Sequence, residues 1–421
     1  MARSGLWLPA AALTVAFSLL AACDGAPPEP VVVRDSAGIT VTRSARPAWT
    51  DDSAWRIGPD PELVVGGLAG QRPYEFTTPG DARLLADGRL LVTHCSNPPE
   101  LRLYGDDGGF LRTLAGPGIG PGQCNFILHS WLAGDTALLY DPSLARITYL
   151  PLEGGDPRVL DLDAAGLADV EDAAPLWISR LADGSLLGRP NDPDPVADGR
   201  HRVPFPYVRL DPSRMALDTV VLAAGTEHVV EGLGTPAADV RSVLFSPFTH
   251  ARAHGENVYL ADSESFWIEE VRADGTLIRR FGRAWKPVPI GRRFRSDYRE
   301  RRVDAAPGSR RAAVRREMAR AVFADHFPAH DGEMLVDPGD HLWVGHVLTP
   351  ESPGRTWTVF APDGRWLGDV TAPIALRITD IGADYVLGVW REPDGTQTIR
   401  RLPLIKPGDG PGLRRRPPPG S

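Results

Sequence analysis

The sequence lacks the short motifs by which many enzymes are recognised. It contains no HExxH pair, no paired CxxC, no Walker loop and no GxSxG turn, so no local motif marks a metalloprotease or a hydrolase. It also lacks an excess of positive charge. A net charge of −8 argues against a dedicated nucleic-acid-binding protein, because such proteins use basic residues to neutralise phosphates.

Long hydrophobic runs are scarce, and the longest lies at the N-terminus. It extends from Leu6 to Leu20 behind Arg3 and leads into the tetrapeptide LAAC at 20–23. This run is shorter than the about 20 residues that a membrane-spanning helix needs. A basic residue, a short apolar run and small residues at its end are typical of a secretory signal, which we place at residues 1–22.

The tetrapeptide that ends the signal resembles the bacterial lipobox. The resemblance implies that Cys23 becomes the acylated first residue of the mature protein, and a Gly- and Pro-rich tether is expected over 23–35. The protein would then be a lipoprotein of the bacterial cell envelope, held to a membrane and facing the periplasm. Asp24 marks inner-membrane retention in enteric bacteria, a rule that is not general, so the choice of membrane stays open. An ordinary signal followed by a chance cysteine is the alternative.

The rest of the sequence repeats a pattern of short apolar strands and tight turns. Its 44 glycines and 41 prolines lie between the apolar runs, which indicates many turns. Asp-Gly pairs such as 87–88 and 363–364 supply the positive φ of tight hairpins, so neighbouring strands are expected to be antiparallel. Six such units follow one another, over residues 81–115, 126–160, 176–224, 248–282, 328–371 and 375–404.

These repeats predict an all-β fold, a six-bladed β-propeller of four-stranded antiparallel blades over residues 36–404. A four-stranded sheet cannot bury both faces alone, so the units are expected to stack around an axis. A β-sandwich also uses short strands but does not predict the recurrence. Because the sixth unit has only three strands, the strand 62–65 is expected to close the last blade. Residues 405–421 are predicted to be a disordered tail.

Two segments resemble a known repeat. GPGIGPGQ at 116–123 and LYDPSLARI at 139–147 are similar to the NHL-type repeat and to the six-bladed propeller lipoproteins related to it. The resemblance covers most of residues 61–404, and it is closest in the first, second and fourth units. Because that family is functionally heterogeneous, the resemblance implies a fold and not an activity.

Two cysteines remain besides Cys23. Cys95 lies in the loop after the second strand of the first unit, and Cys124 lies in the connection to the second unit. Both positions are expected on the same face of adjacent blades. An even pair of cysteines in an oxidising compartment predicts a disulfide between them.

Polar residues recur where the second strands of the units end. In antiparallel blades these positions lie on one axial face, with three histidines near the starts of the inner strands on the same face. Propeller ligand sites are usual at such a mouth, and His with Asp could bind a metal or transfer protons. The alternative is that each residue caps its own turn. The candidate ligand-binding residues are His94, Asp141, Arg189, Asp262 and His346, with His129, His250 and His330 at the rim.

Residues 291–320 carry eleven arginines and four acidic residues. We expect a helical insertion near 291–325, with Ser309 as a helix cap and Val314 and Met318 on one apolar face. Its arginines could simply be solvated. They could also contact anionic lipid headgroups or an acidic partner.

The leading functional hypothesis is an exported, lipid-anchored binding or interaction module that acts through its axial loop face, with no cofactor. Its ligand would be a protein or a small molecule. A lactonase-like or esterase-like hydrolase with a central divalent metal is the alternative, because such a site draws one ligand from each blade and leaves no local motif. A structural scaffold of an envelope complex is the third hypothesis.

Overall fold

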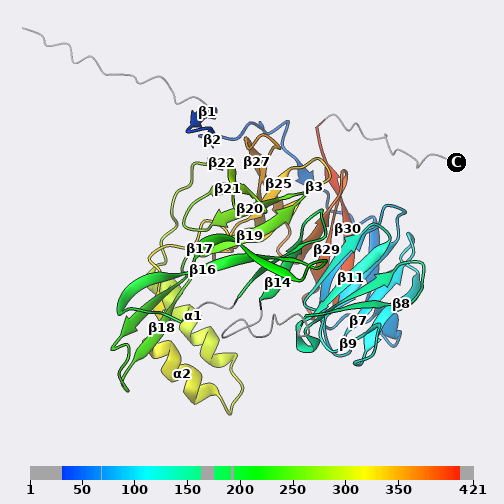
Figure 1. Ribbon diagram of the computed structural model, residues 1–421, viewed down its shortest axis with the longest axis horizontal. Coiled ribbons are helices and arrows are strands. Elements are labelled where there is room, and N and C mark those ends of the chain that lie inside the picture. Colours follow the sequence, from blue (N-terminus) through cyan, green and yellow to red (C-terminus); the bar gives the residue numbers. More distant parts are fainter. Residues whose placement is uncertain (1–30, 68, 163–174, 191–193, 408–421) are drawn as a thin grey trace, which may run out of the picture.

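The computed structural model describes residues 31–67, 69–162, 175–190 and 194–407. The predicted signal peptide, Cys23 and most of the predicted tail lie outside the described residues. Within them the chain is mainly β-structure, with strands in six sheets and two α-helices at one end of the molecule (Figure 1).

The first three sheets follow the first three repeat units. In these three sheets neighbouring strands are antiparallel, except for the short parallel pairs β8–β9 and β18–β23. The strands are β5 (Pro79–Leu84), β6 (Leu90–His94), β7 (Glu100–Tyr104), β8 (Phe110–Pro117) and β9 (Gln123–Cys124); β10 (His129–Ala133), β11 (Thr136–Asp141), β12 (Arg146–Pro151) and β13 (Arg158–Asp161); and β14 (Leu176–Arg180), β15 (Leu186–Arg189), β16 (Gly199–Asp211), β17 (Ala216–Glu231), β18 (Asp239–Leu244) and β23 (Val322–Phe323).

The last three sheets follow the fourth, fifth and sixth units, and the fourth and sixth also include N-terminal strands. Their strands are β19 (Thr249–His254), β20 (Asn257–Asp262), β21 (Trp267–Arg272), β22 (Leu277–Arg283), β2 (Ile39–Ser44) and β1 (Val31–Ser36); β24 (Met334–Val336), β25 (Leu342–Gly345), β26 (Arg355–Phe360) and β27 (Trp366–Ala372); and β28 (Leu376–Ile381), β29 (Tyr385–Arg391), β30 (Gln397–Ile405), β4 (Leu63–Gly66) and β3 (Arg56–Ile57).

The first strands of the sheets contact one another in a closed cycle. In order, β5 contacts β10, β10 contacts β14, β14 contacts β19, β19 contacts β24, β24 contacts β28, and β28 returns to β5. This radial arrangement is a propeller-type fold. It places one strand of every sheet around a common axis.

The hydrophobic core lies between neighbouring sheets. Leu91 and Leu103 of the first sheet pack with Leu139 of the second, and a similar apolar cluster fills each of the other interfaces around the cycle. The predicted turn chemistry is confirmed at Gly88 and Gly364, where φ is +90° and +83°. At Gly364 a Cβ atom would lie 2.7 Å from Phe281 of the adjacent sheet.

The N-terminal segment joins two distant sheets. β4 pairs antiparallel with β30, with Leu63 opposite Arg401, so the last sheet does take a strand that precedes the first unit. The expectation of a tether over 23–35 is wrong for its end, because residues 31–35 belong to β1. β1 pairs with β2, and β2 runs parallel to β22 at the edge of the fourth sheet.

The third sheet departs most from its repeat. Its third and fourth strands, β16 and β17, form a long hairpin that extends to Glu231, beyond the predicted end at 224, and β18 adds a further strand. The helical insertion consists of α1 (Arg292–Asp304) and α2 (Arg311–Arg320). The N-cap of α2 is Arg310, so the prediction that Ser309 caps this helix is wrong. None of the helices in the described ranges has the length and apolar character to span a membrane.

Candidate functional site

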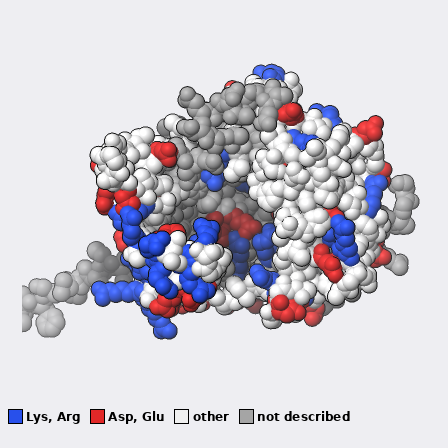
Figure 2. Space-filling view, turned by 90° about the horizontal axis from the view of Figure 1, so that it is seen from below, with Lys and Arg blue, Asp and Glu red and all other residues white. Residues whose placement is uncertain are grey.

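A cavity of about 200 Å³ lies where the first strands of the sheets meet. Asp81 and Arg83 come from β5, His129 from β10, Arg252 from β19, and Glu333 precedes β24. The remaining lining residues are Trp131, Ile178, Ala251, Gly332, Met334, Leu335 and Thr379. One face of the molecule has a hollow near its centre in which acidic and basic side chains lie close together (Figure 2).

The charged groups of this cavity influence one another. Burial, together with repulsion by Arg83, lowers the pKa of Arg252 to about 10, while Asp81 and Glu333 oppose the change. Arg252 therefore keeps its charge at neutral pH. Burial raises the pKa of Glu333, against the attraction of Arg355.

The cavity contains charges that are paired and charges that are not. Arg355 bridges Asp331 and Glu333, and its Nη2 lies 2.5 Å from Glu333 Oε2. By contrast, the side chains of Asp81, Arg83 and Arg252 make no hydrogen bond or ion pair within the described part of the chain, and Arg83 Nε is buried without a partner. Half-buried charges of both signs thus face the cavity without direct partners.

His129 is the one predicted site residue that lines this cavity. Its ring packs on Trp131, with ring centroids 6.0 Å apart. Burial lowers its pKa, and nearby Arg252 and Arg83 act in the same direction against the attraction of Asp81. The imidazole is therefore neutral near pH 7, and it can offer one donor and one acceptor to a molecule in the cavity.

Three further predicted histidines gather between the fourth and fifth sheets. The rings of His250 and His330 are 6.0 Å apart, and Phe266 lies 5.5 Å from His330 and 5.0 Å from His346. Burial is the main cause that lowers the pKa of His250 to about 4, of His330 to about 3 and of His346 to about 4. His346 Nε2 is 2.8 Å from Thr358 Oγ1. These rings are neutral and packed on an aromatic side chain.

Arg189 and Asp262 lie beside this histidine cluster. The Arg189 guanidinium stacks on Phe248, 5.1 Å from the ring centroid, and Phe248 lies 5.0 Å from His250. Asp262 forms an ion pair with Arg202 at 2.9 Å and accepts a hydrogen bond from the backbone of Glu264. Five predicted residues, from Arg189 to His346, are therefore near neighbours, but none of them lines the axial cavity.

His94 and Asp141 do not reach the cavity, because their polar atoms are occupied by local backbone groups. His94 Nδ1 is 2.6 Å from the Pro98 carbonyl, and Nε2 accepts from the Thr77 amide. Asp141 Oδ1 caps the 3-10 turn η2 (Pro142–Leu144), and Oδ2 accepts from the Asn125 amide at 2.7 Å. At these two positions the turn-capping alternative applies, so the convergence predicted for them is wrong.

The predicted disulfide is also wrong, because Cys95 and Cys124 are free thiols. Buried Cys124 directs its Sγ toward the carbonyls of Pro99 and Gly116, 3.5 Å from each, whereas Cys95 Sγ lies against Gly80. Burial raises the pKa of Cys124 to about 12 and also raises that of Cys95. Both thiols are protonated and poor nucleophiles.

Four charged residues of the axial cavity were not predicted from the sequence: Asp81, Arg83, Arg252 and Glu333. The available signal was a charged residue inside or beside a first strand, as in the segment Ala251-Arg252-Ala253. The first strands of the sheets lie around the axis, so a charged residue in one of them is a candidate to line the axial cavity. Among the described residues, no group of three or more His, Cys, Asp or Glu side chains is arranged to hold a metal ion.

Comparisons with known proteins give the fold and no family. No protein-family model matches the sequence, and no curated protein matches it. A DUF4221 family member from Bacteroides vulgatus superposes with a TM-score of 0.50 at 7% identity, covering 85% of this chain and 100% of its own. Virginiamycin B lyase from Staphylococcus aureus gives 0.38 at 10% identity, covering 82% and 99%. A protein of unknown function from Bacteroides thetaiotaomicron gives 0.38 at 14% identity, covering 84% and 75%.

Proposed function

We propose that this protein is an exported, lipid-anchored, six-bladed β-propeller that binds a small polar molecule in its axial cavity. The signal-like N-terminus and the tetrapeptide 20–23 support export and anchoring at Cys23. The number of sheets and the closed cycle of contacts between their first strands support six blades. The axial position of the cavity supports a binding role, because such positions are favoured for ligands on rigid scaffolds.

The observation that carries the proposal is the set of unpaired charges in the cavity. Removing a charge from water is costly unless a counter-charge or a hydrogen bond replaces the water. Asp81 and Glu333 attract Arg252 at longer range, but Asp81, Arg83 and Arg252 make no hydrogen bond and no close ion pair among the described residues. A bound molecule with charges of both signs would supply the partners. Its anionic group would pair with the two guanidinium groups, and its cationic group would pair with Asp81.

The size of the cavity limits the ligand. About 200 Å³ corresponds to roughly seven water molecules at about 30 Å³ each. That space suits a small zwitterion such as a free amino acid, and it excludes a folded protein. His129 and Trp131 add a neutral donor–acceptor group and an apolar wall. The proposed class of ligand is therefore a small zwitterion with a carboxylate and an ammonium group.

A thermal-shift screen tests this function. The full-length protein in detergent is heated with each member of a panel of amino acids, dicarboxylates and diamines, and its melting temperature is compared with that of the variant Arg252→Met. The matched control is Arg272→Met, because Arg272 is an exposed arginine at the end of a strand. We expect zwitterions to stabilise the wild type and the control but not Arg252→Met. If dicarboxylates and diamines stabilised the wild type as much as zwitterions do, this result would contradict the zwitterion assignment.

A further inference from the structure

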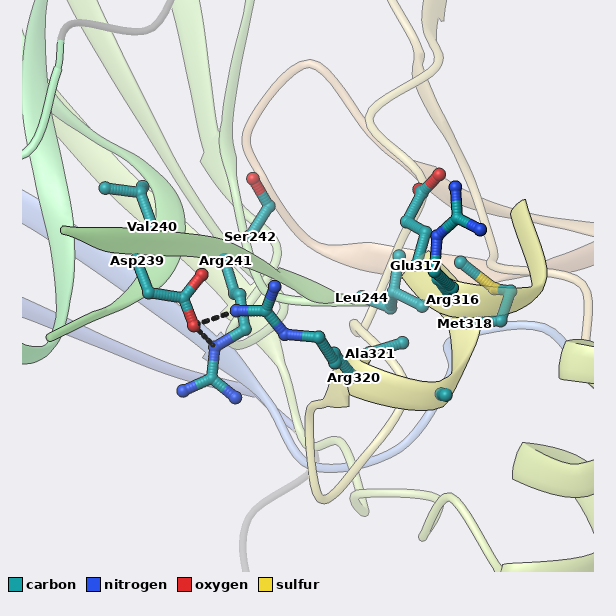
Figure 3. Close-up of a pocket in the computed structure, with 11 residues that line it drawn as sticks. Asp239, Val240, Arg241, Ser242, Leu244, Arg316, Glu317, Met318, Arg320 and Ala321 are labelled. Atoms are coloured by element: carbon teal, nitrogen blue, oxygen red, sulfur yellow. Dashed lines mark ion pairs between the residues drawn. The ribbon is translucent and has the colours of Figure 1, made fainter. Parts of the chain in front are cut away.

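A second cavity of the described structure lies away from the axis. It is a groove of about 730 Å³ between β18 and α2. Figure 3 shows side chains from both elements around it, with Asp239 joined to Arg241 and Arg320 by ion pairs. Val240, Leu244 and Met318 provide apolar surface, and 46% of Val240 is exposed. This groove has no role in the function proposed above.

One side of the groove is an open strand edge. Residues 239–242 of β18 pair with β17 along one edge, with Val240 opposite Val230. On the other edge, β23 pairs only with Val243 and Leu244 of β18. Within the described residues, the backbone of 239–242 therefore has no strand partner on the side of β23. An unpaired edge beside an apolar groove can accept an added strand.

The opposite side of the groove is held rigidly. Phe245 contacts the rings of Phe294, Tyr298 and Phe327, with centroids 5.2 to 5.5 Å apart. The Arg299 side chain donates to the Met318 and Ala321 carbonyls at the end of α2. These contacts fix α2 relative to β18, so the groove does not have to form when a partner arrives.

The positive charge around the groove favours a partner of negative charge. α1 and α2 place most of the eleven arginines of residues 291–320 in exposed positions, against four acidic residues. Arg316 lines the groove and forms no ion pair among the described residues. Two copies of this chain would bring two basic surfaces together, which opposes pairing of β18 with itself. An acidic segment complements this surface.

A membrane is disfavoured as the partner. In Figure 1, β1 lies at the opposite end of the molecule from α2. If Cys23 carries the lipid anchor, the seven residues 24–30 reach at most about 25 Å from it. The arginine-rich helices would then face away from the membrane. We therefore propose that β18 and α2 bind an extended acidic segment of a partner protein by strand addition.

Fluorescence anisotropy tests this proposal with full-length protein in detergent. The probe is a fluorescein-labelled decapeptide of alternating Glu and Val. Two further peptides are N-methylated on the odd or on the even residues, so one of them cannot donate hydrogen bonds to β18. We expect the unmodified peptide and one methylated peptide to bind, and the other methylated peptide to fail. Absence of binding by the unmodified peptide, or equal binding of all three, would overturn the proposal.

Charge variants locate the site. The double variant Arg316→Ala/Arg320→Ala should weaken peptide binding about tenfold, because both changes remove positive charge from the groove. The matched control, Arg301→Ala/Arg302→Ala, removes the same charge from α1 and should change binding less than about twofold. An equal loss of peptide affinity in both double variants would show general electrostatic attraction, and it would overturn the assignment of the binding site to the groove. A different result would assign the surface to lipid. In that case the wild type would bind phosphatidylglycerol vesicles but not the peptide, and Arg316→Ala/Arg320→Ala would abolish the vesicle binding.

Discussion

The buried histidine His330 should make the protein lose stability in acid, and replacing it by phenylalanine should remove part of that loss. His330 has no exposed surface and packs edge-on against Phe266 and His250. Burial and repulsion by His250 and His346 lower its pKa from 6.5 to about 3, while the backbone of Asp262 opposes them. In the unfolded chain the same group keeps its ordinary pKa near 6.5.

The sign of the effect follows from proton uptake. Because the folded pKa is depressed, the unfolded state binds a proton below pH 6.5 and the folded state does not. Stability is therefore complete above pH 6.5 and falls as the pH drops toward 3. At about 1.4 kcal/mol per pKa unit, His330 lowers the free energy of unfolding by about 3 kcal/mol between pH 7 and pH 4.

Urea unfolding followed by tryptophan fluorescence at pH 7.0, 5.5 and 4.0 measures this loss. The variant His330→Phe keeps an aromatic ring and does not titrate, so its free energy of unfolding should fall by about 3 kcal/mol less than that of the wild type. Burial raises the pKa of Asp331 and Glu333, which acts in the opposite direction in both proteins and cancels in the comparison. The control His326→Phe changes an exposed histidine. An identical pH dependence of His330→Phe and wild type would refute the reasoning.

Three further predictions concern the packing. Val65→Ala, in the strand that completes the last sheet, removes a side chain that is 1% exposed and should lower the free energy of unfolding by about 2 kcal/mol in urea titrations; no loss would contradict the packing of β4. Gly332→Ala places a Cβ atom 2.0 Å from the His250 ring at a φ of +82°, so the melting temperature should drop, with a cost of about 2 kcal/mol or more. Because Cys95 and Cys124 are free, dithiothreitol should leave the melting temperature unchanged, and the buried Cys124 should react with Ellman's reagent only after unfolding; a drop on reduction would indicate a disulfide.

The repeats could be predicted because each strand and turn has a local signal. Asp363 and Gly364 predict a hairpin turn independently of the rest of the sequence. The position of β4 followed from counting strands in the last unit. The pairing of β2 with β22 had no such signal, because Thr42 and Phe281 are far apart in sequence and the edge of the fourth sheet could have remained open. The length of β17 likewise depends on its pairing with β18.

The site was harder to predict than the fold, because side-chain direction depends on register. The second-strand positions were assigned to one axial face from strand order, which does not reveal whether a carboxylate turns toward the axis or toward its own backbone. The Asp141 carboxylate turns toward its own backbone, and the residue is fully buried. Arg252 was visible inside an apolar segment, but only the register of β19 with its neighbours places it at the axis. Charges within first strands are the signal to use in other propellers.

We propose above that the axial cavity binds a small zwitterion through its unpaired charges. Isothermal titration calorimetry with the zwitterion that raises the melting temperature most tests it directly, on the wild type, Arg252→Met and Arg272→Met. We expect one binding site per chain, at least about tenfold weaker affinity in Arg252→Met because a charged hydrogen bond is lost, and unchanged affinity in Arg272→Met. Equal affinity in the wild type and Arg252→Met would contradict it.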